Sequence, residues 1–449
     1  MRVQGNQRGA TLLDTLIGIA LMLLVFVGIT AVFRLSVDVV TNNKARTGAL
    51  ALAQERMEYI RALSYSDIGT SGGIPSGDLE QEEEVSLNGV SYTRKTLVRY
   101  IDDPKDGEGI ADENDITADS KEVKVTVSWE VKSGTRSTAL TSRVSPPGIE
   151  QAVPGGTLSI FVVDADVVPV PSAVVSIVNN SVSPLVSVDV LTNEDGEATF
   201  IGVPEGVGYE IAVSKVGQST AQTYDADAEN TNPDPGHLTV VDSATTESTF
   251  AIDSLASLTV ETHIVSGTTT VPVENIDFNI RGNKTIGADG LENPIYKYDA
   301  DVNSGGSGVF SDSAIEWDVY TMSIDGSATG YDIMESCETQ PVFVEPASSN
   351  TVRLVLAPHT AHSLLVDVKD EAGSTLEDAS VRLYRGVYDE TEDTSSCGQT
   401  FFSGLSEGTV LGGNAYSLDV TLAGYEPFSS LDDVDASGAS RFSVVLEEI

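Results

Sequence analysis

The stretch RGATLLDTLIGIALMLLVFVGITAVFR, residues 8–34, decides how the rest of the chain must be arranged. From Thr11 to Phe33 it contains 23 residues and a single charge, Asp14. A run of this length is long enough for a helix that spans a bilayer. A secretory signal peptide has a shorter apolar core followed by a small-residue cleavage site, and no such site follows here. The stretch therefore predicts a membrane-spanning helix, with Arg2 and Arg8 before it and Arg34, Lys44 and Arg46 after it.

The helical pattern continues beyond this apolar run into a polar segment. Small and apolar residues recur there at i, i+4, i+8 and i+11, which places them on one face of a helix. These residues are Ala49, Ala53, Met57 and Ile60. Residues 66–69, Ser-Asp-Ile-Gly, then have turn chemistry. We expect one unbroken helix from about Thr11 to about Tyr65, half in lipid and half in water.

Charge is spread unevenly along the sequence. The chain has 25 Lys/Arg and 68 Asp/Glu, a formal net charge of −43, but residues 1–61 contain seven basic and only four acidic side chains. The remainder contains 18 basic and 64 acidic side chains, a field that repels nucleic acid and anionic headgroups. Direct nucleic-acid binding by the bulk of the chain is therefore not expected. At 449 residues the chain also needs three or more domains.

Asp14 is the unusual residue of the predicted span. A carboxylate at the bilayer centre costs about 2.5–3.5 kcal/mol, although interfacial water and the helix N-terminus reduce this cost near the start of a span. Asp14 is either a residue that reaches the membrane edge or an acid that awaits a cation within the membrane. Cleavage after Gly9 would create a new amine on Ala10, four positions before Asp14 in the sequence. The amine of a neighbouring subunit would then supply the cation.

The residues RG–ATLLD–TLIGIALMLL resemble the class III leader of type IV prepilins and type II secretion pseudopilins. In that family a membrane aspartyl peptidase, the prepilin peptidase, cuts after a leader Gly on the cytoplasmic side and methylates the new amine. The fifth mature residue is an acid, usually Glu, that helps to register subunits in a filament. The resemblance implies cleavage between Gly9 and Ala10, N-methylation of Ala10 and an assembly role for Asp14. Ala10 departs from the usual Phe or Met, and Asp14 from the usual Glu.

A small antiparallel sheet is predicted after the helix. Residues 85–101 contain a hairpin with Asn88-Gly89 as its turn, and residues 121–146 contain a second hairpin. The second hairpin alternates apolar with polar residues, the period of a half-buried strand. The alternating residues are Val123, Val125, Val127 and Trp129, with Leu140 on the returning strand. A helix packed on such a sheet is similar to the head of minor pilins and pseudopilins.

An acidic loop lies between the two hairpins. Calcium takes six to eight oxygen ligands from a flexible loop, and this loop has the oxygens and two glycines, although it does not fit the EF-hand pattern. Some pseudopilins hold calcium in a loop before their last strands. The alternative is a solvated acidic loop. The candidate calcium ligands are Asp103, Asp106, Asp112, Asn114, Asp115 and Asp119.

After a Pro/Gly-rich linker, three strand-rich segments repeat a common order that includes a strand of the form Y-x-(I/L/M)-x-V. Short strands at this spacing predict β-sandwiches. The order resembles carboxypeptidase regulatory-like and Cna-B-like modules, which implies a spacer or binding module. We therefore expect an α+β pilin-like domain followed by about three all-β sandwich modules. The ranges are 1–9 for the leader, 10–33 for the membrane helix, 34–146 for the pilin-like helix and head, 147–156 for the linker, and 157–253, 254–358 and 359–449 for the modules.

Cysteine and histidine are scarce in this chain. Cys337 and Cys397 fall in the second and third repeats, where an exported location permits a disulfide between modules; two separate buried thiols are the alternative. His359 and His362 have a metal-like spacing but no third ligand beside them. No Ser/His/Asp arrangement, P-loop or dinucleotide fingerprint is present, and we expect no enzyme activity.

Two functions remain open on these grounds. The first is a minor pilin or pseudopilin-like subunit, with its N-terminus cytoplasmic, that assembles with other pilin subunits and displays a β-stalk for adhesion, uptake or secretion. The second is a single-span anchored surface protein that binds a ligand or glycan and never polymerises. The pairing of Gly9 with Asp14 favours the first, since a plain anchor has no use for an intramembrane acid. A minor role is favoured because three extra modules on each subunit would crowd a major-pilin lattice.

Overall fold

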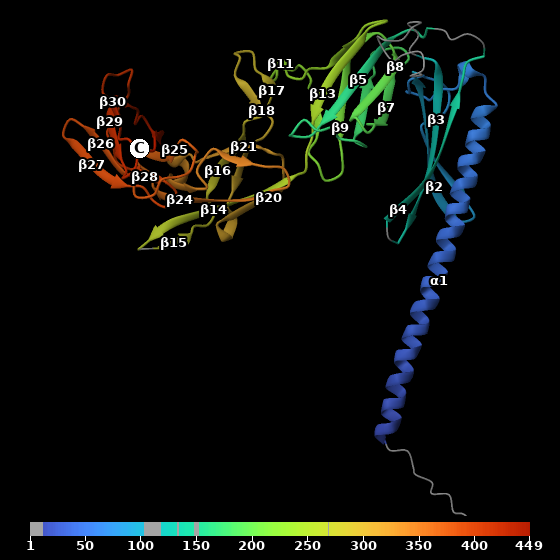
Figure 1. Cartoon of the computed structure of the whole chain (residues 1–449), viewed down its shortest axis with the longest axis horizontal. Coiled ribbons are helices and arrows are strands. Elements are labelled where there is room, and N and C mark those ends of the chain that lie inside the picture. Colours follow the sequence, from blue (N-terminus) through green and yellow to red (C-terminus); the bar gives the residue numbers. More distant parts are fainter. Residues whose placement is uncertain (1–11, 103–117, 133, 148–151, 268) are drawn as a thin grey trace, which may run out of the picture.

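The computed structural model describes residues 12–102, 118–132, 134–147, 152–267 and 269–449. One long N-terminal helix is followed by many strands in several mainly antiparallel sheets, so the predicted fold class is confirmed. In Figure 1 the helix is a stem that extends away from the sheets, and the β-modules follow one another along the chain.

Helix α1 (Leu12–Arg61) contains 50 residues without a break. The four residues of the predicted stripe are at most 4% exposed: Ala49, Ala53, Met57 and Ile60. The predicted end near Tyr65 is wrong, because α1 ends at Arg61. The Leu63 amide then donates to the Ile60 carbonyl at 3.1 Å, an i→i−3 bond that tightens the last turn. A short 3-10 helix, η1 (Tyr65–Asp67), follows.

Four antiparallel strands form one sheet against the upper part of α1, in the order β1-β2-β3-β4. This sheet, residues 34–61 of α1 and the segment between them, residues 62–81, are called the head below. The strands are β1 (Glu82–Leu87), β2 (Val90–Ile101), β3 (Ser120–Val131) and β4 (Gly134–Val144). Asn88 and Gly89 join β1 to β2 with φ of 53° and 79°, the left-handed pair that a type I′ turn requires. The predicted apolar alternation on β3 is buried in the same cluster as the stripe of α1, with Trp129 6% exposed.

Three β-sandwich modules follow the head. Module 1 contains β5 (Gly156–Val163), β6 (Val174–Asn179), β7 (Val186–Leu191), β8 (Glu197–Val203), β9 (Gly206–Ser214), β10 (Ala221–Gln222), β11 (Asn232–Pro233), β12 (Leu238–Val240) and β13 (Thr245–Ala251). Module 2 contains β14 (Ala256–Ser266), β15 (Thr269–Pro272), β16 (Asp277–Gly282), β17 (Thr285–Ala288), β18 (Pro294–Tyr296), β19 (Asp299–Asn303), η3 (Gly305–Ser307), β20 (Val309–Ile315), β21 (Asp318–Ser323), α2 (Gly326–Thr329), β22 (Tyr331–Cys337), β23 (Val342–Val344) and β24 (Ser349–Pro358). Module 3 contains β25 (Ser363–Asp370), β26 (Ser380–Arg385), β27 (Tyr388–Asp393), β28 (Gln399–Phe402), β29 (Tyr416–Thr421), β30 (Phe428–Val434) and β31 (Ala439–Leu446).

All three modules repeat one topology. In each, the first strand pairs in parallel with the last, as in β5–β13, β14–β24 and β25–β31. The second sheet places one strand between two antiparallel neighbours, as in β7-β6-β9, β19-β16-β21 and β27-β26-β29. One topology used three times is what internal sequence repeats predict.

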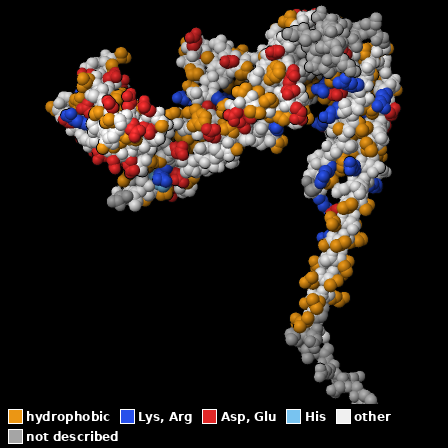
Figure 2. Space-filling view, in the orientation of Figure 1, with side chains coloured by type: hydrophobic (Ala, Val, Ile, Leu, Met, Phe, Trp, Pro, Cys, Tyr) orange, Lys and Arg blue, Asp and Glu red, His pale blue; other side chains and the backbone are white. Residues whose placement is uncertain are grey.

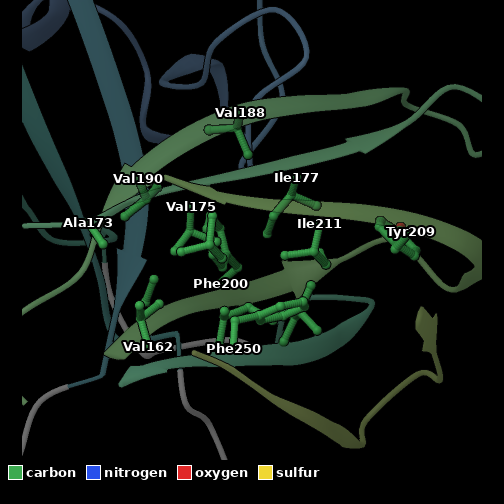
Figure 3. Close-up of a cluster of buried hydrophobic side chains, with 14 of the residues drawn as sticks. Val162, Ala173, Val175, Ile177, Val188, Val190, Phe200, Tyr209, Ile211 and Phe250 are labelled. Atoms are coloured by element: carbon green, nitrogen blue, oxygen red, sulfur yellow. The ribbon is translucent and has the colours of Figure 1, made fainter. Parts of the chain in front are cut away.

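Each module buries its own hydrophobic core between its two sheets. Figure 3 shows the core of module 1, where side chains such as Val175, Ile177, Phe200 and Phe250 gather between facing strands. The cores of modules 1, 2 and 3 fall within residues 158–252, 256–356 and 364–446, and the core of module 1 also takes in Ile74 of the head. The predicted domain ranges, as independently folding units, stay a prediction.

A buried tyrosine recurs in the Y-x-(I/L/M)-x-V strand of every module, although in module 2 Ile324 takes the place of the valine. The hydroxyl of Tyr209 donates to the Pro204 carbonyl, that of Tyr320 to Glu316 at 2.8 Å, and that of Tyr416 to Ser406 at 3.0 Å. Each bond ties the strand to the chain a few residues upstream, as the tyrosine corner does in other sandwiches. Burial raises the pKa of Tyr209 to about 12, because the charged phenolate is disfavoured away from water.

Candidate assembly surface and module junctions

The lower part of α1 is an exposed apolar surface. Every large hydrophobic side chain described between Leu16 and Val40 is 47–74% exposed, and residues 21–27 are apolar without interruption. A helix that is apolar on all sides requires a membrane or other helices around it. Within the described residues, α1 is the one helix long and apolar enough to cross a membrane. Figure 2 shows this bare apolar stem below the head.

The predicted processing site adjoins this surface. Gly9 and Ala10 lie outside the described residues. Asp14 belongs to the first turn of α1 by its backbone, and its side chain is also outside the described part. Cleavage, methylation and the assembly role of Asp14 therefore stay predictions.

Most of the predicted calcium loop lies outside the described residues as well, namely Asp103, Asp106, Asp112, Asn114 and Asp115. Asp119 is described: it is 5% exposed and directly precedes β3. Two residues further, Lys121 is 2% exposed and donates to the carbonyls of Tyr65 and Ile68 at 2.8 and 2.7 Å. The ammonium thereby holds the segment after α1 against the start of β3, and burial lowers its pKa to about 8.

An ion-pair network joins α1 to the head sheet. Arg94 is 8% exposed and lies 2.9 Å from Glu83, while Arg56 of α1 lies 3.2 Å from the same carboxylate. The hydrogen bond from Arg94 lowers the pKa of Glu83, with burial opposing it. Arg94 also donates to the Leu52 carbonyl of α1 at 3.4 Å. These contacts fix the rotation of the helix relative to the sheet.

The head is linked to module 1 through the edge strand β7. The Ser187 amide donates to the Gly72 carbonyl at 2.7 Å, and the Gln81 side chain donates to the Ser187 carbonyl at 2.6 Å. Ile74 adds an apolar contact, being 4% exposed within the core of module 1. Backbone pairing and burial together couple these two parts.

Modules 1 and 2 share a small three-stranded sheet, in which β11 of module 1 pairs with β17 of module 2. Beside it lies a cavity of about 200 Å³ lined by residues of both modules. Its two lysines, Lys284 and Lys297, both contact Glu316, at 2.7 and 2.5 Å. Lys297 also donates to the Thr220 carbonyl of module 1 at 2.7 Å. The ammonium groups of both lysines are therefore already paired within the junction.

Modules 2 and 3 are joined covalently, since Cys337 and Cys397 form a disulfide with their Cα atoms 5.6 Å apart. Buried polar contacts surround the bond. The Ser336 amide donates to the side chain of Gln399 at 2.6 Å, and Arg441 donates to the Gln340 carbonyl at 2.9 Å while pairing with Asp367.

The histidine pair also lies at this junction. His359 contacts Asp332 at 2.8 Å, and the same carboxylate accepts a bond from the Thr360 amide at 3.0 Å. Asp332 therefore fixes the start of the connection between modules 2 and 3. These contacts place His359 in a polar cluster at the junction.

Comparison with known proteins gives no family model and no curated protein that matches the chain. Solved structures that match include the TIE protein of Bacillus anthracis, at 14% identity over 83% of this chain and 74% of that one, with a TM-score of 0.19. A minor pilin of Streptococcus agalactiae matches at 15% identity over 46% of this chain and 97% of that one, TM-score 0.23. A shaft pilin of Lactobacillus rhamnosus matches at 11% identity over 44% and 98%, TM-score 0.18. At these TM-scores the superpositions carry no argument about function.

Sequence reasoning missed a buried hydroxyl that recurs in every module. Thr192 accepts from the Ala173 amide and Thr394 from the Ala379 amide, both at 2.9 Å, and Ser304 accepts from Ile276 at 3.0 Å. All three residues are at most 5% exposed. The signal was present in the sequence, because each hydroxyl residue lies a few positions before a glycine in the repeat.

Proposed function

We propose that the chain is a minor pilin or pseudopilin-like subunit. Prepilin peptidase removes residues 1–9, Ala10 becomes the methylated N-terminus, and α1 anchors the subunit with its N-terminus cytoplasmic. The head and three modules then project from the membrane, or from a filament of pilin subunits, for adhesion, uptake or secretion. The observation that carries the proposal is α1 itself, which is one continuous helix with an exposed apolar lower part and an upper part packed on a four-stranded sheet.

The length of the exposed apolar surface supports assembly over simple anchoring. From Leu16 to Val40 it covers 25 residues, roughly 37 Å of helix, whereas a hydrocarbon core is about 30 Å thick. Leu35 and Val40 are still 65% and 67% exposed, beyond the first base, Arg34, that follows the apolar run. Neighbouring copies of α1 would cover the part that lipid does not.

The test is incorporation of Asp14 variants into filaments purified from cells. We expect Asp14→Ala to abolish incorporation while the protein still reaches the membrane, and Asp14→Glu to restore it, since a longer carboxylate keeps the charge that would pair with the Ala10 amine. Asp78→Ala, at an exposed position of the head, is the matched control. If all three variants behave alike, and the chain stays monomeric in the membrane, the chain is a plain anchor for its modules.

A further inference from the structure

The end of the head nearest the apolar stem carries a cluster of basic side chains. We define this foot as residues 34–46 of α1 together with the two hairpin turns, residues 87–90 and 130–136. The Tyr92 hydroxyl donates to the Ala45 carbonyl at 3.0 Å, and Lys132 contacts Asp38 at 2.9 Å, so both hairpins lie beside this part of α1.

The foot has an excess of unpaired positive charge. It contains five bases and two acids, Asp38 and Glu130. The bases are Arg34, Lys44, Arg46, Lys132 and Arg136. All but Lys132 lack a carboxylate within 4.0 Å among the residues that the structure describes. Every one of the five is exposed. With five bases and two acids, the foot has a formal net charge of +3 in a chain whose formal net charge is −43.

The acidic part of the molecule is attached to the opposite end of the head. Residues 147–449 contain nine Lys/Arg and 48 Asp/Glu, and module 1 docks at Gly72, Ile74 and Gln81, away from the hairpin turns. Figure 2 shows Lys and Arg gathered on the head above the apolar stem, and Asp and Glu spread over the modules. The molecule is therefore electrostatically polar along its length.

We propose that the foot binds anionic lipid headgroups where α1 leaves the membrane, an inference that rests on the proposed membrane anchoring. The bases begin directly after the apolar run, at Arg34, and Lys44 and Arg46 follow within six residues of Val40, where the exposed apolar surface of the lower helix ends. A negative membrane surface attracts such juxtamembrane bases and repels the acidic modules. The pair of effects holds the head on the bilayer and the modules away from it.

The acidic modules of a second copy offer the same negative charge, but the position of the foot favours lipid. Its bases surround the exposed apolar helix, which must itself be in or at the membrane, whereas the modules of any anchored copy start at the far end of the head.

The test uses the full chain reconstituted into vesicles of phosphatidylcholine alone or with phosphatidylglycerol added. The readout is the acetylation rate of Lys44 and Lys132, with Lys95, which is 61% exposed on the head sheet, as the internal control. We expect anionic vesicles to slow acetylation of the two foot lysines roughly fivefold or more, and 0.5 M salt to reverse the effect. Lys95 should react equally in both.

A charge-matched pair of variants sharpens the test, with Lys132 as the readout. Arg46→Glu with Arg136→Glu should abolish the lipid-dependent protection, while Lys124→Glu with Arg143→Glu, the same charge change farther from the foot, should leave it intact. Equal rates in both vesicle types would overturn the inference. If the protection of Lys132 depends on the protein-to-lipid ratio and not on lipid charge, the inference is overturned, and the foot binds the acidic modules of a second copy instead. Failure of the chain to float with either vesicle would instead overturn membrane anchoring.

Discussion

Tyr320 shows how one buried hydroxyl contributes to the stability of a module, here module 2. It is 1% exposed, and its hydroxyl donates to the Glu316 carbonyl at 2.8 Å. Tyr320→Phe leaves the ring in place but removes the bond, so we expect module 2 to lose about 1 kcal/mol of unfolding free energy. Hydrogen exchange of β21 under mild denaturant measures the loss. Tyr296→Phe in the same module is the control, since no hydrogen bond of its hydroxyl is found among the described residues. Equal losses would mean that ring substitution alone is responsible.

Lys121 makes the stability of the head depend on pH. Burial lowers its pKa from 10.5 to about 8, so between these values the unfolded chain binds more protons at this group than the folded chain does. The free energy of unfolding of the head should therefore increase as the pH rises from about 8. We expect this rise between pH 7.5 and 9.5, below the range where the tyrosines begin to ionise, and we expect Lys121→Met to remove it.

The measurement is denaturant unfolding followed by Trp129 fluorescence in a Trp317→Phe background, since the chain has two tryptophans and Trp129 lies in the head core. Lys124→Met, on the same strand but with its side chain on the other face, should keep the pH dependence of the unmodified chain. A slope that survives Lys121→Met would assign it to another group.

At the scale of the elements, the disulfide between β22 and the loop before β28 closes a chain separation of 60 residues. Chain-entropy arguments give about 4 kcal/mol for such a loop, and native disulfides contribute about 2–5 kcal/mol. We expect Cys337→Ala with Cys397→Ala to destabilise modules 2 and 3 by this order and to leave the head unchanged. Non-reducing peptide mapping checks the bond. Denaturation of the unmodified chain and of the double variant measures the contribution of the bond to the free energy of unfolding. Two free thiols in the exported protein would contradict the expectation.

The acidic loop between β2 and β3 gives a second prediction at this scale. Calcium would gather its carboxylates, and we expect EDTA to lower the melting temperature of the head, with calcium but not magnesium restoring it. Asp119→Asn should weaken the response, while Asp78→Asn, outside the loop, should not. An unchanged melting temperature in EDTA would show that the loop is simply solvated.

The sequence patterns predicted most of the elements. The stripe on α1 and the alternation on β3 required only helix and strand periods, and Asn88-Gly89 specified its own turn. The three repeats predicted three sandwiches because each repeat contains the strands of one closed two-sheet unit.

The parts that were not predicted depend on contacts between distant residues. The basic foot brings residues 34–46 beside residues 130–136, and no local pattern reports that approach. In the sequence pattern, Lys121 is one of several polar residues on a half-buried strand. In the structure it is buried, because the segment after α1 folds over it. The end of α1 was placed too late because the tightening of its last turn has no residue signature.

At the scale of the whole molecule, an apolar stem, a basic foot and acidic modules follow one another along the chain. Backbone pairing, a shared sheet and a disulfide couple the successive parts from the head to module 3. These linkages hold the successive modules to the head, which suits the proposed display of the modules from a membrane or a filament. This arrangement is useful to a filament subunit and to an anchor alike, so the distinction between them returns to the processing of the N-terminus.

The most direct test of the account is therefore intact and N-terminal peptide mass spectrometry of the protein purified from cell membranes or filaments. The account predicts a mature chain that begins at Ala10 with a methylated amine, and that is found in filaments together with other pilin subunits. A mature chain that still begins at Met1, and is found only as a membrane monomer, would contradict it.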